Sequence, residues 1–148
     1  MARRVFFSFH YQRDIWRVNQ IRNIHNVIGC TAAGFQDASV WEEAKRKGDA
    51  AVKALINMGL ENTSVTVVCV GSKTAGRTYV NYEIDQSIGR GNGVLAVQIH
   101  HLLDRDGKAD LAGAIPSKIS ALGYKSYKYV DHEMLGKWIE EAAKAAGK

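Results

Sequence analysis

The chain has 148 residues, of which 46% are hydrophobic and 24% charged, and its formal net charge is +5 at pH 7. These values are typical of a soluble globular protein with one domain over residues 1–148, and the single proline, Pro116, argues against long disordered linkers. Basic residues are spread along the chain, with one small cluster at residues 45–47, which argues against a nucleic-acid partner. There is no signal-peptide pattern and no apolar run long enough to span a bilayer, so we expect a cytoplasmic protein without a membrane contact.

The first predicted elements are a strand, a helix and a second short strand. Val5–Phe9 is a continuous apolar run, which is typical of a buried strand in a parallel sheet. Helical spacing follows, so we expect a helix that Asp14 caps and that ends at Gly29. Its apolar positions are Ile15, Val18, Ile21 and Ile28. A short strand over Ala33–Phe35 is expected next.

The next segment predicts one helix and one strand. Ser39-Val40-Trp41-Glu42 is a capping-box pattern, which marks the beginning of a helix. Because the apolar positions continue beyond Gly48, we expect one helix that crosses this glycine and ends near Gly59. Ser64–Val70 is rich in β-branched residues and predicts a buried strand.

The second half of the chain repeats the alternation of helix and strand. Val80, Ile84 and Ile88 predict a helix, and Gly89, Gly91 and Gly93 follow it, so these glycines indicate a helix end rather than a phosphate loop. The remaining expectations are a buried strand over Gly93–Ile99, an irregular segment from His100 to Lys118, an edge strand over Tyr124–Val130, and a final helix capped by Asp131.

Strands that alternate with helices pair in parallel through right-handed crossovers. We therefore expect an α/β domain with a flavodoxin-like fold. Its mainly parallel sheet has about five strands and is flanked by helices in three layers.

Several common site patterns are absent from the sequence. It has no P-loop, no dinucleotide-binding glycine motif after the first strand and no nucleophile elbow. The pair His100-His101 has no further ligand at metal spacing, so we expect no metal. The third strand ends in Val70-Gly71-Ser72, without the aspartate that a response-regulator receiver needs there.

Polar and aromatic residues gather at the predicted carboxyl edge of the sheet, where ligands bind in open α/β folds. The candidates are Phe6, Ser8, His10, Asp14, Asp37, Trp41 and Glu83. Residues two apart on a strand share a face, so Phe6, Ser8 and His10 are expected to point the same way. Glu83 lies in the first turns of its helix, where the helix dipole favours the ionised carboxylate. Each residue also has a purely structural reading, as core, loop cap, turn acceptor or surface ion pair.

Three segments resemble the TIR-like domains of the bacterial Thoeris anti-phage system. They are RRVFFSFHYQRD at residues 3–14, GFQDASVWEEAKRKGD at residues 34–49 and TYVNYEIDQSIGRGN at residues 78–92. The likeness extends from about Arg3 to Ile99, with the motifs in the same order, and the TIR superfamily is similar more loosely. Many TIR domains place a tryptophan four residues before the glutamate, where this chain has Tyr79.

The resemblance implies a flavodoxin-like TIR fold that cleaves NAD⁺ as its substrate, with no other cofactor. Such enzymes release nicotinamide and make a cyclic or conjugated ADP-ribose signal, which acts on a separate effector protein in anti-phage defence. The catalytic glutamate of the family falls on Glu83, its strand-one aromatic on Phe6, and its loop residues near Ser8, His10 and Asp37. Self-assembly through TIR surfaces is a further expectation.

The residue chemistry is compatible with that activity. Nicotinamide leaves as a neutral group, so one carboxylate that stabilises the developing ribosyl cation suffices. Phe6 is placed to stack on a ring, and Arg77 or His10 to meet the pyrophosphate. Two alternatives stay open: a non-catalytic TIR-type protein-interaction module, and a sensor that binds a nucleotide without converting it.

Overall fold

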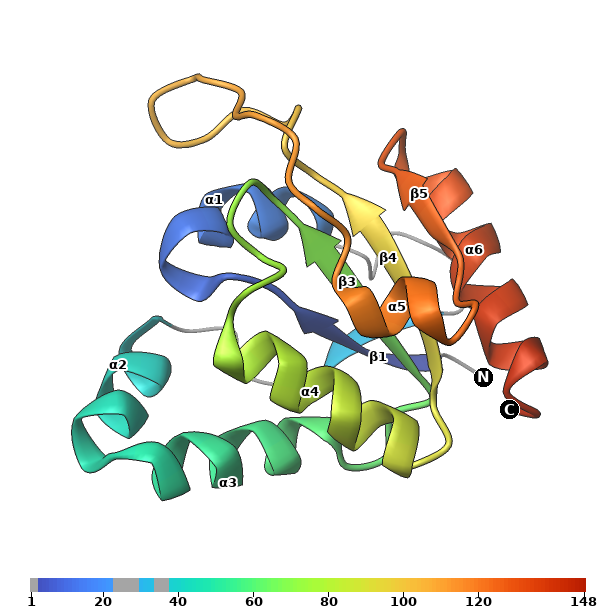
Figure 1. The fold of residues 1–148 in the computed structure, drawn as a ribbon, viewed down its shortest axis with the longest axis horizontal. Helices are drawn as coiled ribbons and strands as arrows, with labels where there is room; N and C mark the ends of the chain where they lie inside the picture. The colour runs from blue at the N-terminus through green and yellow to red at the C-terminus, as the bar shows by residue number, and fades with distance from the viewer. Residues whose placement is uncertain (1–2, 23–29, 34–37) are drawn as a thin grey trace.

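The computed structural model describes residues 3–22, 30–33 and 38–148, and its centre is a five-stranded sheet with the order β2-β1-β3-β4-β5. Every pair of neighbouring strands is parallel. The strands are β1 (Arg3–Ser8), β2 (Cys30–Ala33), β3 (Val65–Val70), β4 (Gly93–Gln98) and β5 (Ser126–Lys128) (Figure 1). This strand order is that of flavodoxin-like proteins, so the predicted fold class and strand number are confirmed.

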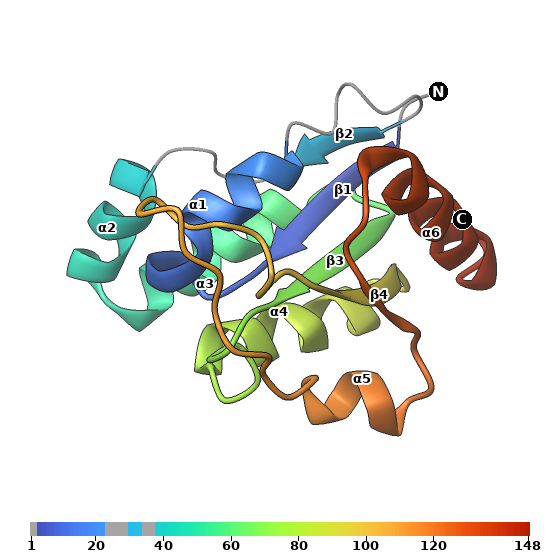
Figure 2. The ribbon, with the colours of Figure 1, turned by 90° about the horizontal axis from the view of Figure 1, so that it is seen from above.

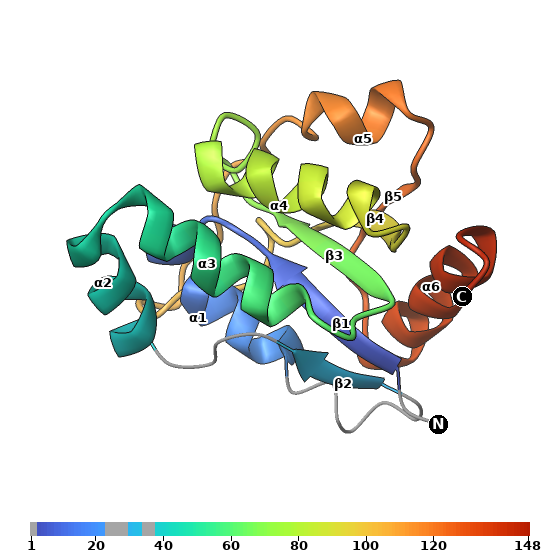
Figure 3. The same ribbon diagram turned by 90° about the horizontal axis from the view of Figure 1, so that it is seen from below.

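Helices cover both faces of the sheet. They are α1 (Tyr11–Arg22), α2 (Ala38–Lys47), α3 (Asp49–Leu60), α4 (Thr78–Gly89), α5 (Ser117–Ala121) and α6 (His132–Ala145). Figure 3 shows α4 and α5 on one face of the sheet, and α1 and α6 on the other. All six residues of β3 are buried, because both of its faces are covered. Among the described residues, no helix has the length and apolar character needed to cross a bilayer.

The beginning of α1 differs from the prediction. Asp14 does not cap the helix, because it is the fourth residue of α1 and its backbone amide donates to the His10 carbonyl over 2.9 Å. His10 precedes the helix, and its Nδ1 accepts the backbone N–H of Arg13 at 3.4 Å. Asp14 is instead fully buried, and its Oδ1 accepts from Arg17 at 3.2 Å. The predicted end of this helix at Gly29 lies outside the described residues.

The helix predicted across Gly48 is two helices. Gly48 has φ 113° and ψ −178°, a conformation that L-residues rarely adopt, so α2 ends before it and α3 begins after it. The helix α2 begins at Ala38, one residue before the predicted cap. The second strand ends at Ala33, where the predicted strand was expected to begin.

The later elements follow the sequence closely. Gly91 has φ 74°, and its amide donates to the carbonyl of Ile88, so the glycines after α4 do end that helix. Asp131 caps α6, because its Oδ1 accepts the backbone N–H of Met134 at 2.8 Å. The predicted edge strand is present but shorter, and β5 pairs only with β4.

Residues 99–116, which we call the strap, join β4 to α5 without regular structure. Figures 1 and 2 show the strap at the arrowhead end of the sheet, where it passes α1 before it reaches α5. The buried Arg17 side chain holds it, with Nε and Nη2 donating to the carbonyls of Leu102 at 2.8 Å and Lys108 at 3.0 Å. The irregular segment predicted from His100 to Lys118 is therefore confirmed up to residue 116, but its last two residues belong to α5, a helix that the sequence did not predict. The strap is tied to the carboxyl edge of the sheet.

Candidate active site

A hydrogen bond joins Ser8 to Glu83 at the carboxyl edge of the sheet. Ser8 is the last residue of β1 and pairs with Val68 of β3, and Glu83 projects from the second turn of α4. The Ser8 hydroxyl donates to Oε1 of Glu83 over 2.7 Å, and both residues are buried. Polar residues at such a depth are uncommon unless they are paired, so this pair is the first element of the site.

The protonation of Glu83 differs from the expectation. Burial raises the pKa of its carboxyl to about 8, and the hydrogen bond from Ser8 opposes this rise only in part. Burial therefore outweighs the helix dipole, which was expected to keep this carboxylate ionised. The dipole acts within the first turn, and Glu83 is the sixth residue of α4, where loss of water dominates.

Glu83 lines a small pocket of about 40 Å³. The pocket lies between the beginnings of α1 and α4 and one side of α2. Its lining residues are Phe9, His10, Tyr11, Gln12, Trp41, Lys45, Arg77, Tyr79, Val80 and Glu83. Four of the predicted candidates, His10, Trp41, Arg77 and Glu83, thus line one space. Ser8 does not line it but is hydrogen-bonded to the Glu83 carboxyl.

One wall of this pocket consists of aromatic rings in series. The ring centroids of Phe9 and Tyr11 are 5.5 Å apart, and those of Tyr11 and Trp41 are 5.2 Å apart, both in stacked geometry. Trp41 then meets Tyr79 edge to face at 5.7 Å, and the Tyr79 hydroxyl donates to Asp49 at 2.9 Å. Tyr79, which stands where many TIR domains have tryptophan, therefore carries the ring that continues this wall. Such a wall suits the flat rings of a nucleotide.

The rim of the pocket is positively charged. Burial lowers the pKa of His10, and the nearby cations Arg77, Arg13 and Lys45 lower it further. Arg77 and Lys45 are exposed at the mouth. A rim of this kind attracts phosphate groups, since the summed field of several cations raises the local concentration of anions.

Phe6 does not line this pocket. Phe6 is 1% exposed and packs in the main hydrophobic cluster, so β1 directs it into the core rather than into the pocket. Because β1 ends at Ser8, His10 does not share a strand face with Phe6 and Ser8 as expected. Asp37 lies outside the described residues, and its role stays a prediction.

Several pocket residues were not among the predicted site residues. Lys45 follows Trp41 by four positions on α2, and residues with this spacing lie on the same side of a helix. This spacing was the only indication in the sequence that Lys45 lines the pocket. Tyr11 follows directly on the apolar run of β1, and the sequence has no pattern that separates its ring from core residues. Tyr79 stands where many TIR domains have tryptophan, and no other pattern in the sequence indicated that its ring lines the pocket.

A network of ionic and polar contacts connects the two walls of the pocket. Arg13 of α1 donates to Oδ2 of Asp110 through Nε at 3.0 Å and Nη2 at 2.8 Å, and to Ser72 Oγ at 3.0 Å. Ser72, in the loop that leads to α4, donates to the same Oδ2 at 2.7 Å. Asp110 of the strap therefore clamps the beginning of α1 to the loop before α4, and these bonds lower its pKa to about 2.

Two imidazoles lie side by side just beyond β4. The rings of His100 and His101 lie edge to face at 5.3 Å, and His101 Nε2 contacts the Tyr129 carbonyl oxygen at 2.8 Å. Across the described ranges, no three histidine, cysteine or acidic side chains are grouped so that they could hold a metal ion.

Comparison with known proteins places this pocket within a matched region. A family model described as the TIR-like domain of the Thoeris protein ThsB matches residues 6–104, a range that contains every predicted site residue. The chain is also 49% identical over 128 residues to a Bacillus cereus (strain MSX-D12) protein named "Putative cyclic ADP-D-ribose synthase ThsB1". That alignment covers 84% of this chain and 65% of the relative, so the chain spans less than two thirds of the relative's length.

Proposed function

Because the chain belongs to the TIR-like domain family of the Thoeris protein ThsB, we propose that it cleaves NAD⁺ and closes the remaining ADP-ribose into a cyclic nucleotide. Cyclic ADP-ribose is the product in the name of the Bacillus cereus relative. The observation that carries the proposal is the buried residue Glu83, which lines a pocket with an aromatic wall and a cationic rim. A pocket of this kind suits the rings and the pyrophosphate of a dinucleotide.

The first chemical step breaks the bond between the nicotinamide nitrogen and C1′ of the ribose. The electron pair of that bond leaves with the nicotinamide, which departs as a neutral molecule and needs no general acid. Positive charge develops on the ribose, and the ionised Glu83 carboxylate stabilises it. Burial raises the pKa of Glu83 to about 8 and so favours the protonated acid, and the cationic nicotinamide ring promotes loss of the Glu83 proton as it binds.

The second step determines the product. A nucleophilic atom of the same molecule, such as an adenine nitrogen, forms a new bond to C1′, and the adduct then loses one proton to solvent. This internal attack profits from a high effective concentration when the pocket folds the dinucleotide and excludes water. Attack by water instead gives linear ADP-ribose.

Binding of a dinucleotide requires the pocket to widen. Its volume is about 40 Å³, whereas pockets for ligands of this class measure roughly 300–1,000 Å³. Exposed side chains form much of the mouth, including Lys45 and Arg77, and these can turn outward at little cost. The substrate therefore enters by displacing rim side chains, while Glu83 and Ser8 stay fixed in the floor.

The proposal is tested by nicotinamide release from NAD⁺, with products resolved by mass spectrometry. Glu83→Gln keeps the shape of the side chain and removes its charge, so release should fall by at least about 100-fold. Asp85→Asn is the matched control, because Asp85 lies two residues away on α4, pairs with Lys118 and is exposed. This variant should keep full activity. Each protein is assayed with and without lysate from phage-infected cells.

The outcomes separate the candidate functions. Release that depends on Glu83 supports the enzyme, and the product mass distinguishes cyclic nucleotide, conjugate and linear ADP-ribose. Folded wild-type protein that releases no nicotinamide under either condition would favour the interaction module. Saturable NAD⁺ binding without release would favour the sensor.

We also propose that the product is a diffusible signal for a separate effector protein, and that the chain self-assembles when active. A protein-free filtrate of the reaction should switch on an effector encoded beside this protein. Light scattering with and without NAD⁺ should detect assembly. A filtrate from Glu83→Gln must be inert in the first experiment.

A further inference from the structure

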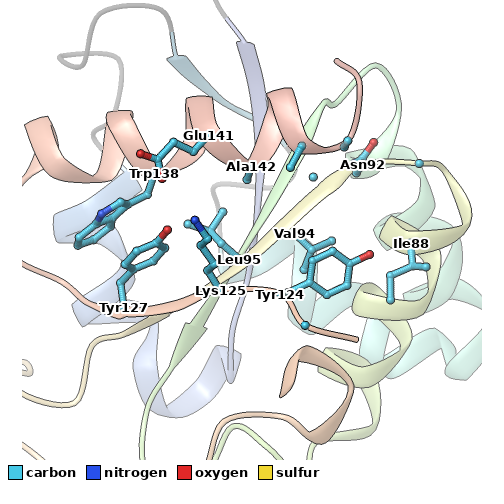
Figure 4. Close-up of a pocket in the computed structure, with 15 residues that line it drawn as sticks. Ile88, Asn92, Val94, Leu95, Tyr124, Lys125, Tyr127, Trp138, Glu141 and Ala142 are labelled. Atoms are coloured by element: carbon cyan, nitrogen blue, oxygen red, sulfur yellow. The ribbon is translucent and has the colours of Figure 1, made fainter. Parts of the chain in front are cut away.

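A second, larger pocket lies at the opposite end of the sheet from Glu83. It has a volume of about 380 Å³ and is lined by the first residues of β4, the segment that leads into β5 and the second half of α6. Figure 4 shows these elements around it. The volume falls within the range of about 300–1,000 Å³ that is usual for small-molecule sites.

The pocket exists because small residues stand where α6 crosses β4. A side chain at Gly93 would overlap the Ala142 carbonyl, so the glycine lets the helix backbone approach the strand at this point. Beyond the contact, the helix presents Ala142, Ala145 and Ala146 to the space. Since β5 has only three residues, no long edge strand fills the gap. The floor is apolar, with Val94 and Leu95 of β4.

Aromatic rings form two sides of this pocket. Tyr127 and Trp138 stack with centroids 4.2 Å apart and an angle of 8° between their planes. Tyr124 lies on the other side, near Ile88, with Lys125 between the two tyrosines (Figure 4). Aromatic rings on two sides and an apolar floor favour a planar ring as the occupant.

The charges in the pocket determine which ring system fits. The Tyr127 hydroxyl donates a hydrogen bond to Glu141, so this carboxylate already has a partner. Burial, together with the charge of Glu141 and this hydrogen bond, raises the pKa of Tyr127. The ammonium of Lys125 has no ion-pair or hydrogen-bond partner within the described part of the chain, and Figure 4 shows it pointing toward α6. The positive charge that remains unpaired therefore favours an anion at this place.

The carboxyl end of α6 sets the orientation of such a ligand. The last turn of a helix carries partial negative charge, which disfavours an anion near Ala145 and Ala146. An anionic group is therefore best placed at Lys125, with the ring directed toward Tyr124 and the alanine side of the pocket.

We propose that this pocket is a second binding site, which takes a small aromatic anion of one or two fused rings with a single carboxylate. The Lys125 ammonium pairs with the carboxylate, and Tyr124 and the apolar floor contact the ring. The proposal does not depend on the activity assigned to Glu83.

The test uses 1-naphthoate as the probe and 1-naphthamide as its neutral counterpart, titrated into isotope-labelled protein and followed by NMR. The acid should bind with a Kd at or below about 1 mM, with shifts at Tyr124, Val94 and Ala145. Lys125→Met should raise the Kd of the acid about tenfold and leave the Kd of the amide unchanged. Lys128→Met, an exposed lysine nearby that does not line the pocket, should change neither.

A filling variant supplies an independent check. Ala146→Leu places a larger side chain in the pocket and should weaken the acid and the amide alike, in protein whose circular dichroism matches the wild type. The proposal is overturned if the acid and the amide bind equally to the wild type, if Lys125→Met has no effect, or if the shifts cluster at Glu83. Absence of saturable binding at about 5 mM overturns it as well.

Discussion

The Ser8 hydroxyl and Oε1 of Glu83 are 2.7 Å apart, which joins the end of β1 to α4 across 75 residues of sequence. In this bond the serine hydroxyl donates and the carboxyl oxygen accepts, an arrangement that is strongest when the carboxylate is ionised. Ser8 therefore favours the charged form of Glu83 and opposes the effect of burial on its pKa. We predicted Ser8 as a substrate-binding residue from the sequence, and its hydroxyl is already used by Glu83.

Ser8→Ala should raise the pKa of Glu83 further above 8. Hydrogen bonds to charged groups contribute about 1.5–3 kcal/mol, so the rise should be about one unit or more. If the ionised carboxylate is the active form, kcat/KM for NAD⁺ reaches its plateau at a correspondingly higher pH. NMR titration of the Glu83 carboxyl carbon measures the same shift without turnover.

Ser87→Ala is the control for this change. Ser87 is also buried on α4, but its hydroxyl donates to the backbone carbonyl of Glu83 at 2.7 Å and not to the carboxylate. The Ser87→Ala variant should therefore leave the pH profile of kcat/KM unchanged. An unchanged profile in Ser8→Ala would show that Ser8 does not set the protonation of Glu83.

Glu83→Gln should remove a pH dependence of stability. The carboxyl pKa is 4.5 in an unfolded chain and about 8 in the folded protein. The folded state therefore holds the proton more tightly between these values, and its stability is lost as pH rises from the first toward the second. Each unit of pKa difference is about 1.4 kcal/mol, so the total loss is a few kcal/mol.

Urea unfolding at several pH values measures this effect. The free energy of unfolding of the variant should rise relative to that of the wild type as the pH rises from about 5 to about 9, because the glutamine side chain does not titrate. Other titrating groups cancel in the difference between the two proteins. A constant difference across the pH range would mean that the carboxyl is not buried in solution.

Asp110→Asn should loosen the strap and raise KM for NAD⁺. The Asp110 side chain is 17% exposed and that of Arg13 is 42% exposed, so their ion pair is screened and contributes about 0.5–1 kcal/mol. We expect a KM a few times higher, nearly unchanged kcat, and faster amide hydrogen exchange at residues 99–116. Asp106→Asn, in the same strap but outside the contacts with Arg13 and Ser72, should change none of these.

Gly71→Ala should destabilise the protein, whereas Gly76→Ala should not. A Cβ at Gly71 would overlap the buried Asp14 carboxylate, which is held by Arg17 and has little room to move. The expected loss in the free energy of unfolding is about 2 kcal/mol or more. Gly76 lies in the same loop, but nothing stands within 4 Å of the added carbon, so its change should stay within about 0.5 kcal/mol. Equal losses from both substitutions would contradict this account.

The sequence predicts the fold well because its strongest signals are local. The apolar runs at β3 and β4 are continuous, and the helices between them keep regular spacing, so strand order and layers follow from general rules. The break at Gly48 escaped prediction because glycine is also tolerated inside helices. Only the packing of α2 against α3 settles which alternative holds.

The site is predicted less completely, because burial depends on distant parts of the chain. His10 and Glu83 were candidates from their places near strand and helix ends, and the family resemblance gave Glu83 its catalytic role. Arg77 was expected to meet the pyrophosphate, and all three residues share one pocket. Asp14 has the sequence position of a helix cap but lies beneath Gly71 with Arg17. The protonated state of Glu83 follows from its depth, which no local pattern records.

The wide sequence separation within the pocket has a consequence for synthesis of the chain. Ser8 meets Glu83 after 75 further residues, and Arg13 meets Asp110 after 97. At about 5–20 residues per second on the ribosome, Glu83 is added to the chain roughly four seconds or more after Ser8. A nascent chain therefore has no assembled pocket, and the cell that makes this protein is exposed to its chemistry only after most of the chain has been translated.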